Sequence, residues 1–128
     1  MATGELSAVE LLEACLRQYE RHDPALNAII HEQIDTARAE ARSADNARAS
    51  GMSIGPLHGL PITVKDSIDW AGTPSTWGDP QHADHRPDED ATVLAQLRAA
   101  GAIVWGKTNV PRHLAEWQTF NTIHGRTN

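Results

Sequence analysis

The sequence predicts an α/β fold. Short apolar runs rich in β-branched residues alternate with amphipathic segments of helical period. After residue 60 the order is strand, loop, helix, glycine turn and strand, and this order is typical of a parallel crossover. The chain has 128 residues, a length that suits at most one domain with a modest core.

The first predicted element is an amphipathic helix over residues 7–21. Its apolar residues recur at three- and four-residue steps: Val9, Leu12, Leu16 and Tyr19. Ser7 and Glu10 have the spacing of a capping box. Asp23-Pro24 predicts the end of the helix, because a residue before proline disfavours helical geometry.

A strand and a second helix follow. The run Ala28–Ile30 is short and rich in β-branched residues, so it predicts a buried strand. The alanine-rich segment Glu32–Ser50 predicts a mostly exposed helix, and Gly51 just beyond it is a typical helix stop.

The second half of the chain has a different composition, with more glycine and proline. Leu60–Val64 predicts a strand between glycine- and proline-rich loops, and Ser67–Arg86 reads mainly as loop. Asp88 and its acidic neighbours open a helix after a proline, and Gly101 ends it. The run Ala102–Trp105 then predicts a buried strand.

Composition and charge exclude several functions. The formal charge is −6, divided as −4 over residues 1–64 and −2 over residues 65–128, so neither half offers a basic face for nucleic acid. The sequence has no apolar run of membrane-spanning length, and its N-terminus lacks the pattern of a secretory signal, so we expect a cytoplasmic protein without a membrane partner. The single cysteine, Cys15, excludes an internal disulfide and is expected in the core.

Lysine is rare, and its two positions are informative. The basic residues are nine arginines and only two lysines, Lys65 and Lys107. Lys65 ends an apolar run, so we expect it to project from a strand end into the loops where α/β proteins place their sites. A lysine that acts as a base must be neutral, and burial lowers its pKa toward that state. The alternative is a surface lysine beside a surface aspartate, Asp66.

Other candidate motifs are weaker. The letters GAIVWGKT around Lys107 match a phosphate loop, but bulky residues fill the cradle and a strand lies inside the motif, which disfavours nucleotide binding. His82 and His85, with acidic neighbours, could form a metal cluster, although a solvated loop is favoured. The following serines lack the turn of a serine nucleophile: Ser53, Ser67 and Ser75.

The chain resembles the N-terminal part of the amidase signature family. The resemblance rests on GPLHGLPITVKDSIDWAGTPSTWGD, DATVLAQLRAAGAIVWGKTNVP and the final NTIHGRTN. It implies a large mixed sheet with helices on both faces, of which this chain is an incomplete part. It also implies an amidase that cleaves carbon–nitrogen bonds through a Ser-cisSer-Lys triad, with Lys65 as its lysine and Asp66 in support. The loop Asp69–Asp79 would then lie near the reacting centre, or alternatively cover the sheet in a purely structural role.

The resemblance also carries expectations about the whole protein. Residues 1–128 are expected to be the N-terminal part of one amidase domain that continues beyond Asn128, where the two serines of the triad would lie. The isolated chain is therefore expected to be inactive. The resemblance implies a small-molecule amide substrate and no cofactor or metal. The alternatives are a truncated, non-catalytic interaction module and the N-terminal part of the A-type subunit of an aminoacyl-tRNA amidotransferase, and only the latter would meet a nucleic acid.

Overall fold

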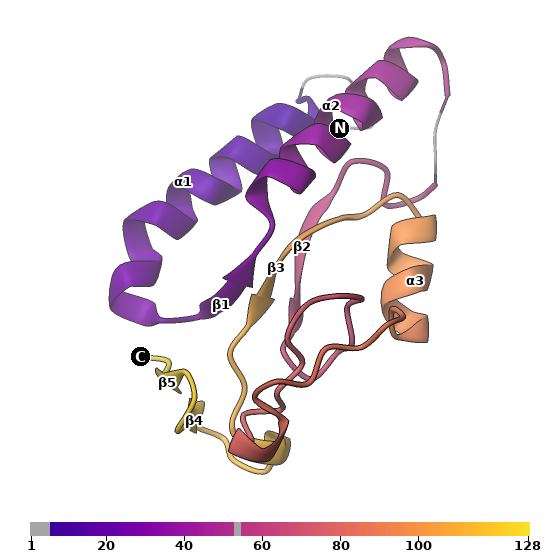
Figure 1. Ribbon diagram of the computed structural model, residues 1–128. Helices are drawn as coiled ribbons and strands as arrows, with labels where there is room; N and C mark the ends of the chain where they lie inside the picture. Colours follow the sequence, from indigo (N-terminus) through magenta and orange to yellow (C-terminus); the bar gives the residue numbers. More distant parts are fainter. Residues whose placement is uncertain (1–5, 53–54) are drawn as a thin grey trace.

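The computed structural model of the chain describes residues 6–52 and 55–128 (Figure 1). Its main helices and strands, in chain order, are α1 (Ala8–Leu26), β1 (Ile29–Glu32), α2 (Ile34–Ala49), β2 (Pro61–Lys65), α3 (Thr92–Ala99) and β3 (Ile103–Thr108). Shorter elements are the 3-10 helices η1 (Pro80–His82) and η2 (Arg112–Leu114) and the hairpin strands β4 (Phe120–Asn121) and β5 (Gly125–Arg126). Within the described ranges, no helix combines the length and apolarity needed to cross a bilayer.

The main sheet is mixed and has helices on both faces. Its strand order is β1-β3-β2, with β2 parallel and β1 antiparallel to the central strand β3. Helices α1 and α2 lie side by side on one face, and α3 lies on the other side together with the long loop that follows β2 (Figure 1). The α/β class, the mixed sheet and the parallel pairing of the two later strands are therefore confirmed.

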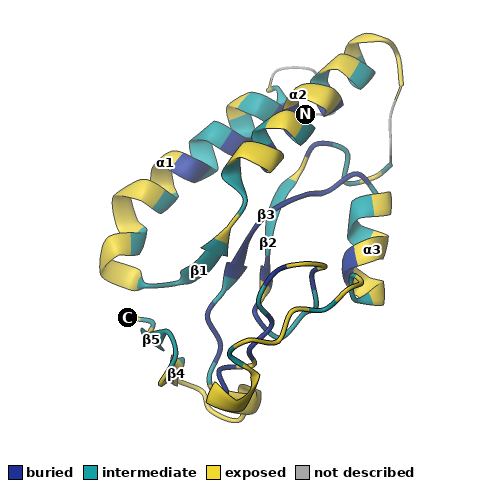
Figure 2. Cartoon of the chain, in the orientation of Figure 1, coloured by how far each residue is buried: buried dark blue, intermediate teal, exposed yellow. Residues whose placement is uncertain are grey.

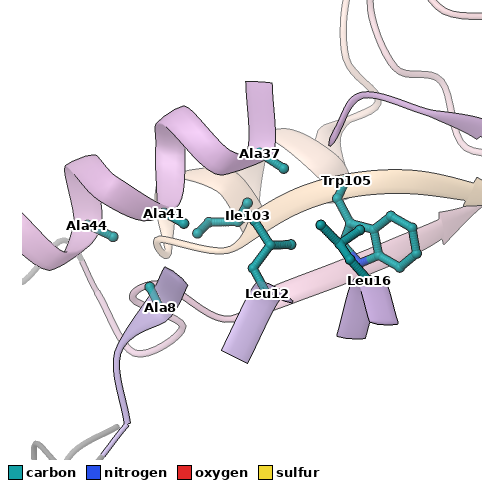
Figure 3. Close-up of a cluster of buried hydrophobic side chains, with 8 residues drawn as sticks. All are labelled: Ala8, Leu12, Leu16, Ala37, Ala41, Ala44, Ile103 and Trp105. Atoms are coloured by element: carbon teal, nitrogen blue, oxygen red, sulfur yellow. The ribbon is translucent and has the colours of Figure 1, made fainter. Parts of the chain in front are cut away.

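The face under α1 and α2, called here the helix face, is packed with apolar side chains (Figure 3). Leu12 and Leu16 of α1 are fully buried. Small buried alanines on α2 let that helix pack closely against α1 and the sheet. The helix predicted to be mostly exposed is therefore exposed on only part of its surface (Figure 2). The buried set is Ala8, Leu12, Leu16, Ala37, Ala41, Ala44, Ile103 and Trp105.

The first helix begins as predicted and ends later. The Ser7 side chain accepts a hydrogen bond from the backbone N–H of Glu10, and the Glu10 carboxylate accepts one from the Ser7 N–H, which confirms the capping box. The predicted stop at Asp23 is wrong, because the helix runs through Pro24 to Leu26. A proline this close to the end removes few helical hydrogen bonds. The Asp23 carboxylate then accepts from the N–H groups of the two residues that lead into β1.

Other elements also differ from the sequence prediction in their bounds or burial. Helix α3 begins at Thr92 rather than at the acidic run, because the Asp90 carboxylate instead accepts from the Ala71 N–H and pairs with Arg98 at 3.2 Å. Strand β1 is half-buried rather than buried, since it is an edge strand. Strand β3 continues beyond the predicted Trp105 to Thr108 because it is paired on both sides.

Candidate functional site

The candidate site lies where β2 ends and the long loop begins. Lys65 is the last residue of β2 and pairs with Thr108 of β3. Its neighbours in the chain, Val64 and Asp66, are both buried, with Val64 in the cluster that packs against α3. Because successive side chains of a strand alternate, Lys65 lies on the opposite side, the helix face. It is exposed, and its ammonium makes no hydrogen bond or ion pair with another described residue.

Asp66 is bonded to the loop rather than to the lysine beside it. Its carboxylate is buried and accepts from the Thr76 N–H at 3.0 Å and from the Thr76 hydroxyl at 2.7 Å. Its own N–H donates to the Thr108 carbonyl at 2.9 Å and so extends the ladder of β2. Within the described ranges, no ion pair joins Asp66 to Lys65. Asp66 is thus not the surface aspartate of the alternative interpretation.

The other lysine, Lys107, is fully buried in the middle of the structure. Its Nζ donates to the Pro74 carbonyl at 2.5 Å and to the Ser75 hydroxyl at 2.7 Å. Burial lowers the pKa of Lys107 to about 8, against the opposing charges of Asp66 and Asp69. Residues 103–108 form a strand, so the strand does run through the letters that resemble a phosphate loop. Sequence reasoning did not predict the burial of Lys107, and only the scarcity of lysine in the chain singled this residue out.

A bulge in the sheet directs Lys107 toward the loop. Val104 packs on the α3 side and Trp105 on the helix face, as strand alternation requires. The register between β2 and β3 then shifts, so that Thr63 pairs with Gly106 and Val64 pairs with Lys107. Lys107 therefore lies on the same side as Val64, where it meets the loop.

Of the serines singled out in the sequence, the two that the structure describes, Ser67 and Ser75, make no hydrogen bond to Lys65. Ser75 is completely buried and its hydroxyl is held by Lys107. Ser67 lies in the turn after β2 and is half-buried, and Ser53 lies outside the described residues. Among the described residues, the lysine at the end of β2 therefore has no serine hydroxyl hydrogen-bonded to it.

The histidines of the loop stay near the surface. His82 and His85 are exposed, and His82 lies 3.7 Å from Asp79. Asp79 is buried, and His113 and Arg112 lie 2.9 Å and 3.2 Å from its carboxylate. The N–H of Gln81, aided by Arg112 and His113, lowers the pKa of Asp79. Among the described residues, no three His, Cys, Asp or Glu side chains come close enough to hold a metal ion.

Cysteine and tryptophan take mainly structural positions. Cys15 is half-buried and lines a surface cavity between α1 and the sheet, together with Thr63 and Trp105. Trp70, in the loop after β2, is buried between Val64, Val104 and α3. The guanidinium of Arg98 lies 5.1 Å from the centre of its ring. Trp77 and Trp117 are exposed.

The C-terminal hairpin reaches the same loop, and sequence reasoning missed this contact. His124 Nε2 lies 3.5 Å from the Thr76 hydroxyl, and burial lowers the pKa of His124. The buried Asn121 amide donates to the Asn109 side chain and to the Val110 carbonyl, which fixes the hairpin against the end of β3. The hairpin therefore lies next to the Thr76–Asp66 hydrogen bonds.

Comparisons with known proteins agree on one family. A family model described as Amidase matches residues 10–128. The chain is 46% identical over 124 residues to the A-type subunit of glutamyl-tRNA(Gln) amidotransferase from Chloroflexus aurantiacus, covering 97% of the chain and 26% of that protein. It is 41% identical over 125 residues to indoleacetamide hydrolase of Bradyrhizobium diazoefficiens, covering 98% of the chain and 24% of that protein.

A solved structure gives the same result for the fold. A fatty acid amide hydrolase matches with a TM-score of 0.92 and 26% identity, over 99% of this chain and 22% of that one. The chain therefore spans about a quarter of the length of the curated relatives it matches.

Proposed function

Because this chain belongs to the amidase family, we propose that the protein containing it cleaves carbon–nitrogen amide bonds, with Lys65 as the base of a Ser-cisSer-Lys triad. The observation that supports this most is the place of Lys65 at the carboxyl end of a strand, with its side chain accessible. A side chain there can reach a group supplied by another segment of the protein.

The two lysines differ in a way that favours Lys65 as the base. A base must come within hydrogen-bond distance of the proton that it accepts. Lys107 has no exposed surface, and its ammonium is occupied by the Pro74 carbonyl and the Ser75 hydroxyl. Additional protein packed around these residues would leave Lys107 buried and occupied. The same additional protein can cover Lys65 and so desolvate its ammonium.

In the proposed mechanism, Lys65 acts in its neutral form. It accepts a proton that passes from the nucleophilic serine through the relaying serine, while the serine oxygen attacks the amide carbonyl and forms an acyl-enzyme. The proton then returns to the leaving amine, and water hydrolyses the acyl-enzyme. The two serines would lie in the segment after Asn128, so residues 1–128 alone would be the inactive N-terminal part of a serine hydrolase domain.

We propose a small-molecule amide as the substrate, without a cofactor, and a cytoplasmic location. Identity to the amidotransferase relative supports a second candidate, in which the same triad releases ammonia from an amide for transfer to glutamyl-tRNA(Gln). A non-catalytic interaction module is the third, and it predicts no turnover of any amide.

The test compares the protein containing this chain with its Lys65→Ala variant. Hydrolysis of indoleacetamide and of a panel of aryl and aliphatic amides is followed by ammonia release, and amidation of glutamyl-tRNA(Gln) is assayed in parallel. We expect Lys65→Ala to lower kcat by about 10²–10⁴-fold. Arg38→Met, which breaks a partly exposed ion pair between α2 and α1, is the matched control and should retain full activity.

Two outcomes would contradict the proposal. Activity that survives in folded Lys65→Ala would remove Lys65 from the mechanism. A folded wild-type protein that turns over none of these substrates would favour the interaction module.

A further inference from the structure

Lys107 is an unusual residue for a core. Its side chain is fully buried, and within the described ranges no carboxylate lies within ion-pair distance of it. Its partners are two neutral oxygens, the Pro74 carbonyl and the Ser75 hydroxyl. An ammonium buried without a carboxylate partner destabilises a fold, because its desolvation is only partly offset by hydrogen bonds to neutral groups. Packing alone would be served better by an apolar side chain of similar volume.

The two oxygens bound by Lys107 belong to a segment that is also held by Asp66. This segment, residues 72–79, follows the turn after β2. Thr76 donates its N–H and its hydroxyl to the Asp66 carboxylate. The Thr76 oxygen in turn accepts from the Gly78 N–H at 3.1 Å. Residues 74–76 are therefore held in succession by Lys107 of β3 and by Asp66, the residue that follows β2.

Lys65 lies between the two residues that hold this segment, Asp66 and Lys107, called here the two anchors. Asp66 is its next residue in the chain, and Lys107 pairs across the sheet with Val64, the residue before it. The two anchors contact the loop on one face of the sheet, while the side chain of Lys65 is turned to the other face. Movement of the 72–79 segment would shift the backbone that carries Lys65 without any contact to the Lys65 side chain.

We propose that Lys107 is a positioning residue for the amide-cleaving reaction: its ammonium holds the 72–79 segment, which through Thr76 and Asp66 fixes the backbone of Lys65. This inference rests on the proposed function of Lys65. Lys107 does not touch the substrate. It contributes through geometry, since a displacement of about 1 Å at a catalytic group can lower a rate by about 10²-fold.

The test uses Lys107→Met in the protein containing this chain, because methionine keeps most of the stem and removes the ammonium. We expect kcat to fall by about tenfold or more, with KM within about twofold, since the fully buried Lys107 does not touch the substrate. We also expect the melting temperature at pH 7 to stay the same or rise, because the buried charge is removed. Arg38→Met, which also removes a cation, should change neither kcat nor KM. A residue with a merely structural role would lower the melting temperature and leave the kcat of the folded fraction unchanged.

A second variant keeps the test decisive if Lys107→Met does not fold. Ser75→Ala removes one of the two oxygens and leaves the lysine in place, and it should lower kcat by a smaller factor with KM unchanged. Either variant, folded and with wild-type kcat, would overturn the positioning role while leaving Lys65 as the base. Full activity in Lys65→Ala would instead overturn the proposed function, so the two failures are distinguishable.

Discussion

The two faces of the sheet are stabilised by different kinds of interaction. On the helix face the buried side chains are all apolar and come from α1, α2 and β3. The loop face has a smaller apolar cluster around Trp70 and Leu94, and beside it a set of buried polar groups: Asp66, Thr73, Ser75, Thr76, Asp79 and Lys107. Apolar burial stabilises a fold without regard to pH, whereas buried polar groups stabilise it only while each keeps its partner. The helix face is therefore stabilised mainly by apolar burial, whereas the loop face also depends on each buried polar group keeping its partner.

The largest effect is expected on the helix face. Leu12 is fully buried between α1, α2 and the sheet, so Leu12→Ala should lower the free energy of unfolding by about 3–4 kcal/mol, from lost transfer energy and the cavity left behind. Denaturant unfolding at pH 6 and pH 9 should give the same loss. A loss that changed by more than about 1 kcal/mol between those pH values would show that the two faces are not separable.

The loop face should instead show pH dependence. The pKa of Lys107 is about 8 in the folded protein against an ordinary value of 10.5, so between these values the unfolded chain binds more protons. The free energy of unfolding should therefore rise with pH across this window, by about 2 kcal/mol from pH 8 to pH 10. Below pH 8 the destabilising effect of the buried charge is constant. Lys107→Met should lack this rise, and an identical rise in that variant would assign it to another group.

Asp66 offers a smaller test of the same face. Asp66→Asn keeps an oxygen for Thr76 but removes the charge, so it should lower the free energy of unfolding by about 1–2 kcal/mol. Hydrogen exchange at the Thr76 amide should speed up in this variant, while amides in α1 should exchange as in the wild type. Equal acceleration in both places would indicate general destabilisation.

The smallest effect is expected at the start of α1. Ser7→Ala removes the side-chain acceptor of the capping box and should lower the free energy of unfolding by about 1 kcal/mol. Ser7→Thr keeps a hydroxyl and should restore most of it. Activity should be unaffected by either change, because the capping box is local to the start of α1 and no hydrogen bond among the described residues joins it to Lys65. A change in kcat would connect this helix to the site.

The same contrast explains what could be predicted from the sequence. Elements whose signals are local were found, as with the capping box of Ser7 and the apolar run ending at Lys65. Boundaries failed where a side chain had a distant partner, as when Asp90 bonded the Ala71 N–H instead of opening α3. The burial of Lys107 depends on a loop more than thirty residues away, and no local pattern could reveal it.

The bulge between β2 and β3 determines on which face of the sheet the Lys107 ammonium lies. Along β3, regular alternation would place Trp105 and Lys107 on the same face, but Trp105 packs under α1 and α2 and Lys107 meets the loop. The shift of register at Gly106 separates them. A side chain at 106 would bring its Cβ within 3.2 Å of the His31 carbonyl oxygen, so glycine suits this close approach of β1. Deleting one residue here would point the Lys107 side chain toward the apolar core of alanines and leucines under α1 and α2. A design that moves this site into another sheet must therefore copy the bulge as well as the side chains.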